Sequence, residues 1–249
     1  MTRAMADKKG PQSDLPVVKR GSGFRLPLFR KRAAVYVDGF NLYHALAHLE
    51  RPHLKWLDLM SLAKALVPKD EVVKRVVWCT AFRPNSRAKL KNHKAYYDAL
   101  LARGVVCRLG HFVTAQDGCN ACGHSWVMSM EKQGDVNFAL SVAADAEDDL
   151  FDVCYLITAD GDHAATARYL KQRFPKKKVV CVAPPGRYPN RFILEWSDAK
   201  AYIDQPMLEN SLLPASLHKR GIRVERPLTY LPPVVNVQKG HLKLVVNNG

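Results

Sequence analysis

Short apolar runs alternate with longer amphipathic segments from about residue 33 to residue 200. Short apolar runs are typical of buried strands, and apolar positions spaced three or four residues apart are typical of helices. This pattern predicts strands at 33–38, 73–82, 105–110, 153–159 and 178–183. It predicts helices at 41–50, 58–67, 86–103, 133–147 and 162–173. Strands that alternate with helices indicate an α/β domain with a mainly parallel central sheet.

Three segments depart from this alternation. Residues 1–32 are rich in Pro, Gly and basic side chains and lack periodicity, which predicts a flexible basic N-terminal arm. Residues 114–130 show no clear period and are expected to be irregular. Residues 201–249 are mixed and partly Pro-rich, so we expect a C-terminal extension. The central domain is therefore predicted at 33–200.

The chain is strongly basic. It carries 38 Lys and Arg against 23 Asp and Glu, a formal charge of +15. Residues 1–32 alone carry nine basic and two acidic side chains, a charge of +7. This excess predicts a polyanionic partner, nucleic acid before a membrane surface, although a protein with an ordinary basic tail would show it too.

Three further features of the sequence bear on where in the cell the protein is found. No run of eighteen apolar residues is present, so no membrane-spanning helix is expected. The first thirty residues lack the apolar centre of a signal peptide. Six cysteines over this length do not form a disulfide scaffold. These features together predict a cytoplasmic protein.

Four carboxylates fall where the predicted strands and helices meet. Asp38 ends the first strand, Asp160 and Asp162 follow strand 153–159, and Asp135 lies in the first turn of helix 133–147. In an open parallel sheet, ligands bind outside the carboxyl ends of the strands. Like charges gathered there are tolerated chiefly around a cation, and hard oxygen ligands suit Mg²⁺ or Mn²⁺. Together with the basic surface, this predicts metal-assisted hydrolysis of a phosphodiester.

Each acid also has an ordinary structural interpretation. Asp38 could brace its turn by accepting backbone N–H groups. Asp135 could be favoured by the helix dipole, and Asp162 could cap the following helix. The acidic run at 145–152 is expected to be a solvated helix end, with Asp145 as the one candidate exception. The convergence of the four acids at one sheet edge nevertheless favours a metal site.

Three stretches in this order and spacing carry a family resemblance: VYVDGFNLYHAL (35–46), EKQGDVNFALSVAADA (131–146) and DVCYLITADGDHAATARYL (152–170). Together they resemble the NYN domain family of PIN-like ribonucleases. The resemblance covers roughly 33–200, and LENSLLPASL (208–217) is also similar to bacterial members.

The resemblance implies a PIN-like, Rossmannoid three-layer sandwich and an Mg²⁺- or Mn²⁺-dependent endoribonuclease. It assigns the metal to the four acids already described, with Asn41 hydrogen-bonded within the site. Thr158 and Asn137 are expected to contact and position these groups without binding the metal themselves. The implied partner is RNA, single-stranded in preference to double-stranded.

The third motif departs from the family pattern Ser-Gly-Asp-Ser-Asp followed by an apolar residue. Here it is TADGDH (158–163). Thr158 keeps the hydroxyl and both acids remain, so these changes do not predict an inactive enzyme. His163 replaces the apolar residue and could line the site or touch phosphate, but we expect an ordinary exposed histidine.

A Cys-x-x-Cys motif lies in GCNACGHSW (118–126). A structural zinc needs four ligands, and this motif supplies half of them. The candidate ligands are Cys119, Cys122, His124 and His111. The alternatives are a metal shared across a homodimer, or two free thiols on a loop. The βαβ context of a thioredoxin-like redox motif is missing.

A basic cluster opens the helix predicted at 86–103. The candidate RNA contacts are Arg83, Arg87, Lys89 and Lys94. Lys and Arg here could follow a phosphate backbone, and Tyr96 or Tyr97 could stack on an unpaired base. The alternative is a surface helix whose charges simply face water.

The leading functional prediction is a metal-dependent endoribonuclease. The main alternative is a non-catalytic module of the same fold that binds RNA or a protein partner. An aspartyl phosphatase is disfavoured because Gly39 and Phe40 follow Asp38, so the required D-x-D pair is absent. An NTPase is disfavoured because no G-x-x-x-x-G-K-[ST] loop is present.

Overall fold

The computed structural model of the chain describes residues 15–17, 30–83, 86–219, 221–233, 235–238 and 241–244. Most of the predicted N-terminal arm, 1–32, therefore lies outside the described residues. Among the helices that are described, none has both the length and the apolar character needed to cross a membrane.

Six parallel strands form the central sheet in the order β3-β2-β1-β6-β7-β8. The strands are β1 (Lys31–Asp38), β2 (Glu71–Thr80), β3 (Val106–Leu109), β6 (Val153–Ile157), β7 (Lys178–Ala183) and β8 (Ala199–Tyr202). All five residues of β6 are buried, as expected for a strand covered on both faces. The predicted α/β class with a mainly parallel sheet is confirmed.

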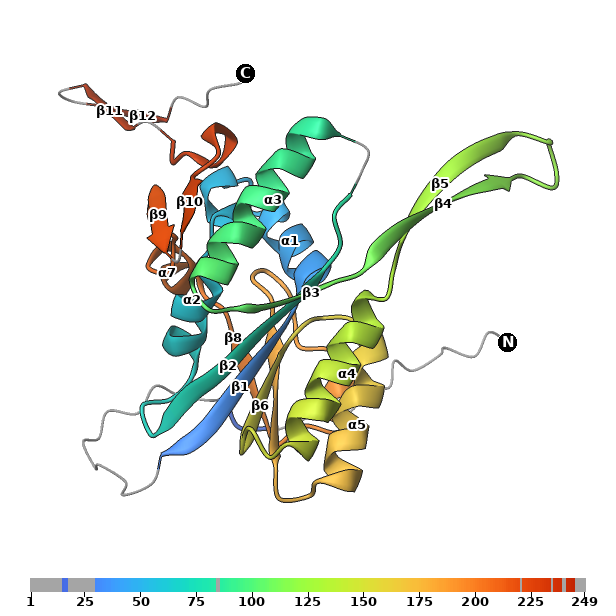
Figure 1. Cartoon of the computed structure of the whole chain (residues 1–249), viewed down its shortest axis with the longest axis vertical. Helices are drawn as coiled ribbons and strands as arrows, with labels where there is room; N and C mark the ends of the chain where they lie inside the picture. Colours follow the sequence, from blue (N-terminus) through green and yellow to red (C-terminus); the bar gives the residue numbers. More distant parts are fainter. Residues whose placement is uncertain are drawn as a thin grey trace, which may run out of the picture.

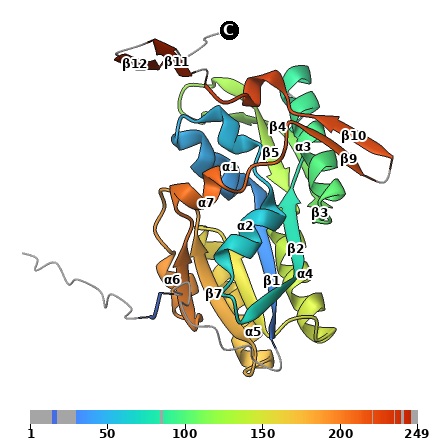
Figure 2. The ribbon, with the colours of Figure 1, turned by 90° about the vertical axis from the view of Figure 1, so that its left-hand side faces the viewer.

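Helices cover both faces of this sheet, which gives three layers (Figures 1 and 2). One face carries α1 (Gly39–His48), α2 (Leu59–Leu66), α3 (Arg87–Ala102) and α7 (Gln205–Glu209). The other carries α4 (Gly134–Glu147), α5 (Ala164–Arg173) and α6 (Arg191–Leu194). Because side chains alternate along a strand, Val35 of β1 enters the first core and Tyr36 the second.

The C-terminal segment adds small elements, of which one hairpin packs on the first face. It contains β9 (Ser216–Lys219), β10 (Ile222–Glu225), β11 (Val235–Gln238) and β12 (His241–Leu244). Short 3₁₀ helices are η1 (Pro52–Lys55), η2 (Gly161–His163) and η3 (Leu228–Tyr230). Leu217 and Val224 of the β9–β10 hairpin pack with Ala99 of α3 and with Trp56, which follows η1. The central sheet continues to Tyr202, so β8 crosses the predicted boundary at residue 200.

The segment expected to be irregular, 114–130, is instead regular. It belongs to an antiparallel hairpin of β4 (His111–Gly118) and β5 (Ser125–Lys132), paired in unbroken register from His111↔Lys132 to Gly118↔Ser125. The hairpin projects away from the three-layer body (Figure 1). Apolar residues at alternate positions, such as Trp126 and Met128, carry the strand signal, which the polar and Gly-rich tip obscures.

Candidate active site

A cavity of about 500 Å³ opens at the carboxyl ends of β1 and β6, beside the start of α4. This is the edge at which parallel sheets bind ligands. Its polar and charged lining residues are Asp38, Asn41, His44, Glu131, Asp135, Asp160, His163 and Arg187. Three of the four predicted acids therefore share one cavity.

Asp38 is held by hydrogen bonds on both carboxylate oxygens. Oδ1 accepts the backbone N–H of Asn41 at 2.9 Å, which makes Asp38 the N-cap of α1. Oδ2 accepts the hydroxyl of Thr158 at 3.0 Å. The Asn41 side chain in turn accepts the backbone N–H of Ala159 at 3.0 Å. Asp38 thus caps its helix and also presents a fixed carboxylate to the cavity.

The end of β6 is organised around Thr158, which is fully buried. Its hydroxyl accepts the backbone N–H of Asp160 at 3.0 Å while it donates to Asp38. The Asp160 side chain accepts the backbone N–H of Asp162 at 3.1 Å and so caps η2. Asp160 lines the cavity, whereas Asp162 is exposed and does not line it.

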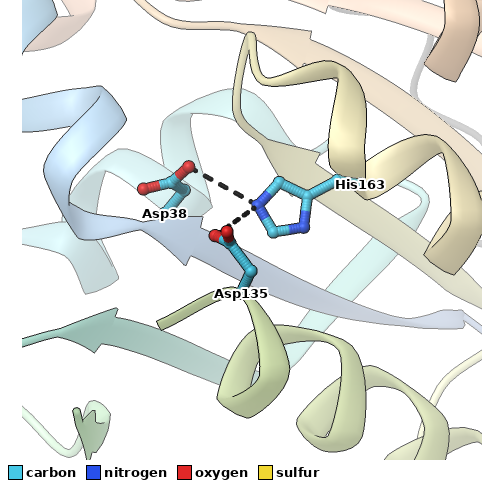
Figure 3. Close-up of side chains that lie close together, drawn as sticks. All are labelled: Asp38, Asp135 and His163. Atoms are coloured by element: carbon cyan, nitrogen blue, oxygen red, sulfur yellow. Dashed lines mark ion pairs between the residues drawn. The ribbon is translucent and has the colours of Figure 1, made fainter. Parts of the chain in front are cut away.

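His163 is buried, with 1% of its surface exposed, which corrects the expectation of an exposed histidine. Its Nε2 atom lies 3.5 Å from Asp38 Oδ2 and 3.5 Å from Asp135 Oδ1 (Figure 3). The ring packs on Phe138, with centroids 4.1 Å apart. Nε2 has no hydrogen-bond partner in the described part of the chain. A 3₁₀ turn brings residues three apart onto one side, so η2 directs His163 back towards the cavity.

The electrostatics of the cavity are those of crowded carboxylates. Burial raises the pKa of Asp135; nearby His163 lowers it, and the charges of Asp38, Asp160 and Asp162 raise it further. Burial likewise raises the pKa of Glu131, and the charges of Asp135 and Asp38 raise it further. Such a cluster favours a compensating cation.

Cys79 also lines the cavity, but its thiol is poorly suited to act as a nucleophile. Burial and the nearby Asp38 carboxylate raise the pKa of its thiol to about 12. The thiolate is the nucleophilic form, so Cys79 stays protonated and inert at neutral pH. Covalent catalysis by this cysteine is therefore disfavoured.

The remaining predicted residues lie around the cavity rather than in it. Asn137 lies in the first turn of α4 but does not line the cavity. Arg83 lies over the ring of Phe112 at 5.9 Å, and Phe112 contacts Phe40, which lines the cavity. The exposed basic residues of α3 are Arg87, Lys89, Lys91 and Lys94. Arg83 is therefore linked to the cavity by two aromatic rings.

Sequence reasoning missed three lining residues. Arg187 follows β7 in the sequence PPGRYPN, so its place after a parallel strand was an available signal. His44 lies one turn of α1 beyond Phe40. Glu131 stands inside the second motif, four residues before Asp135. Arg187 and His44 bring basic groups to an otherwise acidic cavity.

The four zinc candidates do not form one group. His111 begins β4 and contacts Gln133 at 3.2 Å, whereas Cys119, Cys122 and His124 lie at the tip of the hairpin. An eight-residue strand spans about 26 Å, so His111 does not complete a site with the tip cysteines. In the part of the chain that is described, only Asp38, Asp135 and His163 form a group of three ligand atoms close enough together to hold a metal ion.

That group fits a divalent cation. One atom from each residue lies within 4.8 Å of the other two. Two are carboxylate oxygens, and the third is the buried imidazole nitrogen without a hydrogen-bond partner. Carboxylate oxygens suit Mg²⁺ and Mn²⁺, and an imidazole ligand adds preference for a transition metal. The residues present therefore fit the cation that the acidic cluster implies.

Comparison with known proteins places these features in context. The model of the NYN domain matches residues 32–196, which include all three motifs. A solved structure, of a protein of unknown function from Vibrio parahaemolyticus RIMD 2210633, is similar with a TM-score of 0.49 and 21% sequence identity. The match covers 74% of this chain and 97% of that chain. No protein of curated function matches.

Proposed function

This chain belongs to the NYN domain family, as its three motifs predict, and from that premise we propose that it is a metal-dependent endoribonuclease. NYN domains are generally PIN-like nucleases. The observation that carries the proposal is the convergence of Asp38, Asp135 and His163 in a cavity at the carboxyl edge of the sheet. Mg²⁺ or Mn²⁺ is the proposed cofactor, and RNA the substrate.

We assign direct metal ligation to Asp38, Asp135 and His163. Asp160 lines the same cavity, and Asp162 adds negative charge close behind it. When bound, the cation activates water and stabilises negative charge on the phosphate. An imidazole ligand suits Mn²⁺ better than Mg²⁺, so His163 favours manganese at this site.

The supporting residues position these groups. Asn41 and Thr158 each fix one oxygen of Asp38, through a backbone N–H and a hydroxyl respectively. The carboxylate is therefore oriented before substrate arrives, which lowers the cost of reaching a reactive geometry. Arg187 and His44 line the same cavity, and we assign them to bind the phosphate of the substrate.

We propose that RNA approaches along the start of α3. Arg83 lies above Phe112, and the exposed basic side chains of α3 continue from it. Lysine and arginine bind the phosphate backbone, while Phe40 and Phe112 offer rings near the cavity on which a base can stack. Stacking requires unpaired bases, so single-stranded RNA is the preferred substrate.

The second candidate is a non-catalytic RNA-binding module of the same fold. The observation that favours it is the position of His163 Nε2, which lies between the two carboxylates where a cation would otherwise balance their charge. In this module the His163 side chain takes the place of a cation between the two acids. This module would bind RNA in a salt-dependent manner without cleaving it.

One experiment separates the two functions. The purified chain is incubated with a circular single-stranded RNA in Mg²⁺, Mn²⁺ or EDTA, beside Asp38→Asn. A circular substrate has no ends, so only an endonuclease can open it. Metal-dependent opening that the variant lacks supports the nuclease. RNA binding without opening in either metal supports the binding module and overturns the proposed activity.

A further inference from the structure

The tip of the β4–β5 hairpin is folded around the sulfur of Cys119. The backbone N–H of Cys119 donates to His124 O at 2.8 Å, and that of Gly123 donates to Cys119 O at 2.9 Å. Gly123 adopts φ +71°, a left-handed conformation that favours glycine. This closes a tight turn that contains both cysteines.

This turn prepares Cys119 to bind a metal. The backbone N–H groups of Cys122 and Ala121 and the Cys122 side chain hydrogen-bond its sulfur. The thiolate is the form that binds zinc. Cys122 is exposed and Cys119 is half-buried, so both sulfurs can be reached from solvent.

One chain supplies only half of a zinc site. A structural zinc takes four ligands, and the hairpin tip supplies two thiolates. Three of the other cysteines, Cys79, Cys154 and Cys181, are buried in the central sheet, and Cys107 lies on β3. The His124 ring is stacked on Trp126, with centroids 6.0 Å apart. Among the described residues no third His, Cys, Asp or Glu ligand atom forms a group with these two cysteines, so the missing ligands come from another molecule.

The same hairpin has an apolar face with no described covering. Directly paired residues share a face, so Val113, Ala115, Met130, Met128 and Trp126 lie together, with Asp117 paired to Trp126 at the end nearest the tip. Val113 and Trp126 are 39% and 40% exposed. An isolated two-stranded hairpin is only marginally stable in water. A partner that covers this face would stabilise the hairpin.

The charge of the hairpin identifies that partner. Residues 111–132 carry Asp117, Glu131 and Lys132, a net charge of −1 in a chain of +15. Nucleic acid is disfavoured on such a surface, because it binds through positive charge. A second copy presents both the missing pair of thiolates and a matching apolar face, as a two-fold interface requires.

We propose that Cys119 and Cys122 of two chains bind one Zn²⁺ and that the two hairpins pack through their apolar faces. The zinc has four thiolate ligands, which close its coordination. The site is separate from the acidic cavity and does not depend on the proposed nuclease activity. The dimer formed through the two β4–β5 hairpins would contain two acidic cavities, one in each chain.

The test measures zinc content and molecular mass on the full chain, purified under a thiol-free reductant. Elemental analysis and light scattering are applied to the natural sequence and to Cys119→Ser/Cys122→Ser. We expect the double variant to lose half an equivalent of zinc per chain, and its mass to fall from twice 28.0 kDa to 28.0 kDa. The loss counts the hairpin site alone, because the variant keeps the acidic cavity.

Two further measurements address the ligands and the interface. Co²⁺ in place of Zn²⁺ should give a thiolate charge-transfer absorption that the double variant lacks. Met128→Asp should weaken the dimer at least tenfold, whereas the neighbouring Val127→Asp, on the opposite face, should not. One zinc lost per chain from a monomer, no zinc lost, or a dimer unchanged by the double variant would each overturn the proposal.

Discussion

The Nε2 atom of His163 lies 3.5 Å from the Oδ1 atom of Asp135, inside a cavity rather than at the surface. Its only other close charged neighbour among the described residues is Asp38, also at 3.5 Å. Both separations are too long for a strong hydrogen bond, and Nε2 has no such partner. The imidazole is therefore available to a cation between the two acids.

His163→Ala should alter the choice of metal. Removing an imidazole ligand should weaken Mn²⁺ binding by about tenfold or more, and Mg²⁺ binding less, because Mg²⁺ prefers oxygen ligands. Titration calorimetry or the electron paramagnetic resonance of free Mn²⁺ measures this without any assay of cleavage. His44→Ala is the matched control, since His44 lines the cavity outside the three-residue group. Equal losses for both metals would contradict direct ligation.

Asp135→Asn should abolish cleavage while RNA binding survives. The substitution removes one proposed ligand from the start of α4, and we expect the cleavage rate to fall by about 10³-fold, a loss of roughly 4 kcal/mol of transition-state stabilisation. The measurement combines single-turnover cleavage with a filter-binding assay.

Asp148→Asn is the control for Asp135→Asn, because Asp148 is an exposed acid at the opposite end of the same helix. It should cleave at the natural rate. A similar loss in both variants would indicate a general effect of charge on α4 rather than metal ligation.

Much of this site could be predicted because it depends on local order in the sequence. Asp38 and Asp160 follow apolar strands, and parallel strands bring their carboxyl ends together whatever the details of packing. The inward turn of His163 depends on η2, a three-residue 3₁₀ helix too short to leave a periodic pattern. Its spacing of three residues from Asp160 was the one available signal.

The β4–β5 hairpin and the place of Arg187 in the cavity were harder to predict from the sequence, for a different reason. Adjacent apolar residues such as Trp126 and Val127 obscure the period of two in β4 and β5, and a tip of Gly, Asn and Cys interrupts it. Arg187 reaches the cavity from a Pro- and Gly-rich loop whose course is set by tertiary contacts. Local propensity carries little information about either.

Thr158→Val should lower both stability and activity. The variant keeps the shape of the side chain but loses the hydroxyl that donates to Asp38 and accepts the N–H of Asp160. Leaving these buried partners unsatisfied should cost about 1–3 kcal/mol of unfolding free energy. It should also lower kcat, because Asp38 is no longer fixed. Thr158→Ser should restore both; failure of Ser to restore kcat would contradict a positioning role for the hydroxyl.

Asp152 should contribute to stability in a pH-dependent manner. Hydrogen bonds from Arg32 hold the pKa of Asp152 below its usual 3.8, so the unfolded chain binds a proton there more readily than the folded chain. The contribution is therefore fully present above the usual pKa and is lost as pH falls through the folded value. Urea denaturation from pH 7 to pH 3 measures it.

Asp152→Asn isolates this contribution. The variant should be less stable than the natural chain at pH 7, by about 1 kcal/mol or less for a partly exposed ion pair. This difference should shrink as the pH falls below 3.8. A difference that stays constant across the range would show that the lost stability does not come from the Asp152 charge.

Arg187→Ala should reduce the salt dependence of RNA binding. A contact to one phosphate releases counterions, so its loss should lower the slope of log K against log salt by about 0.7 for a single strand. Binding is measured in Asp38→Asn, which keeps the RNA intact. Lys176→Ala is the control, because Lys176 is exposed just before β7, at the opposite edge of the sheet. Equal slopes for the two variants would place the RNA away from the cavity, and a lower slope for Arg187→Ala alone would place a phosphate beside the acids.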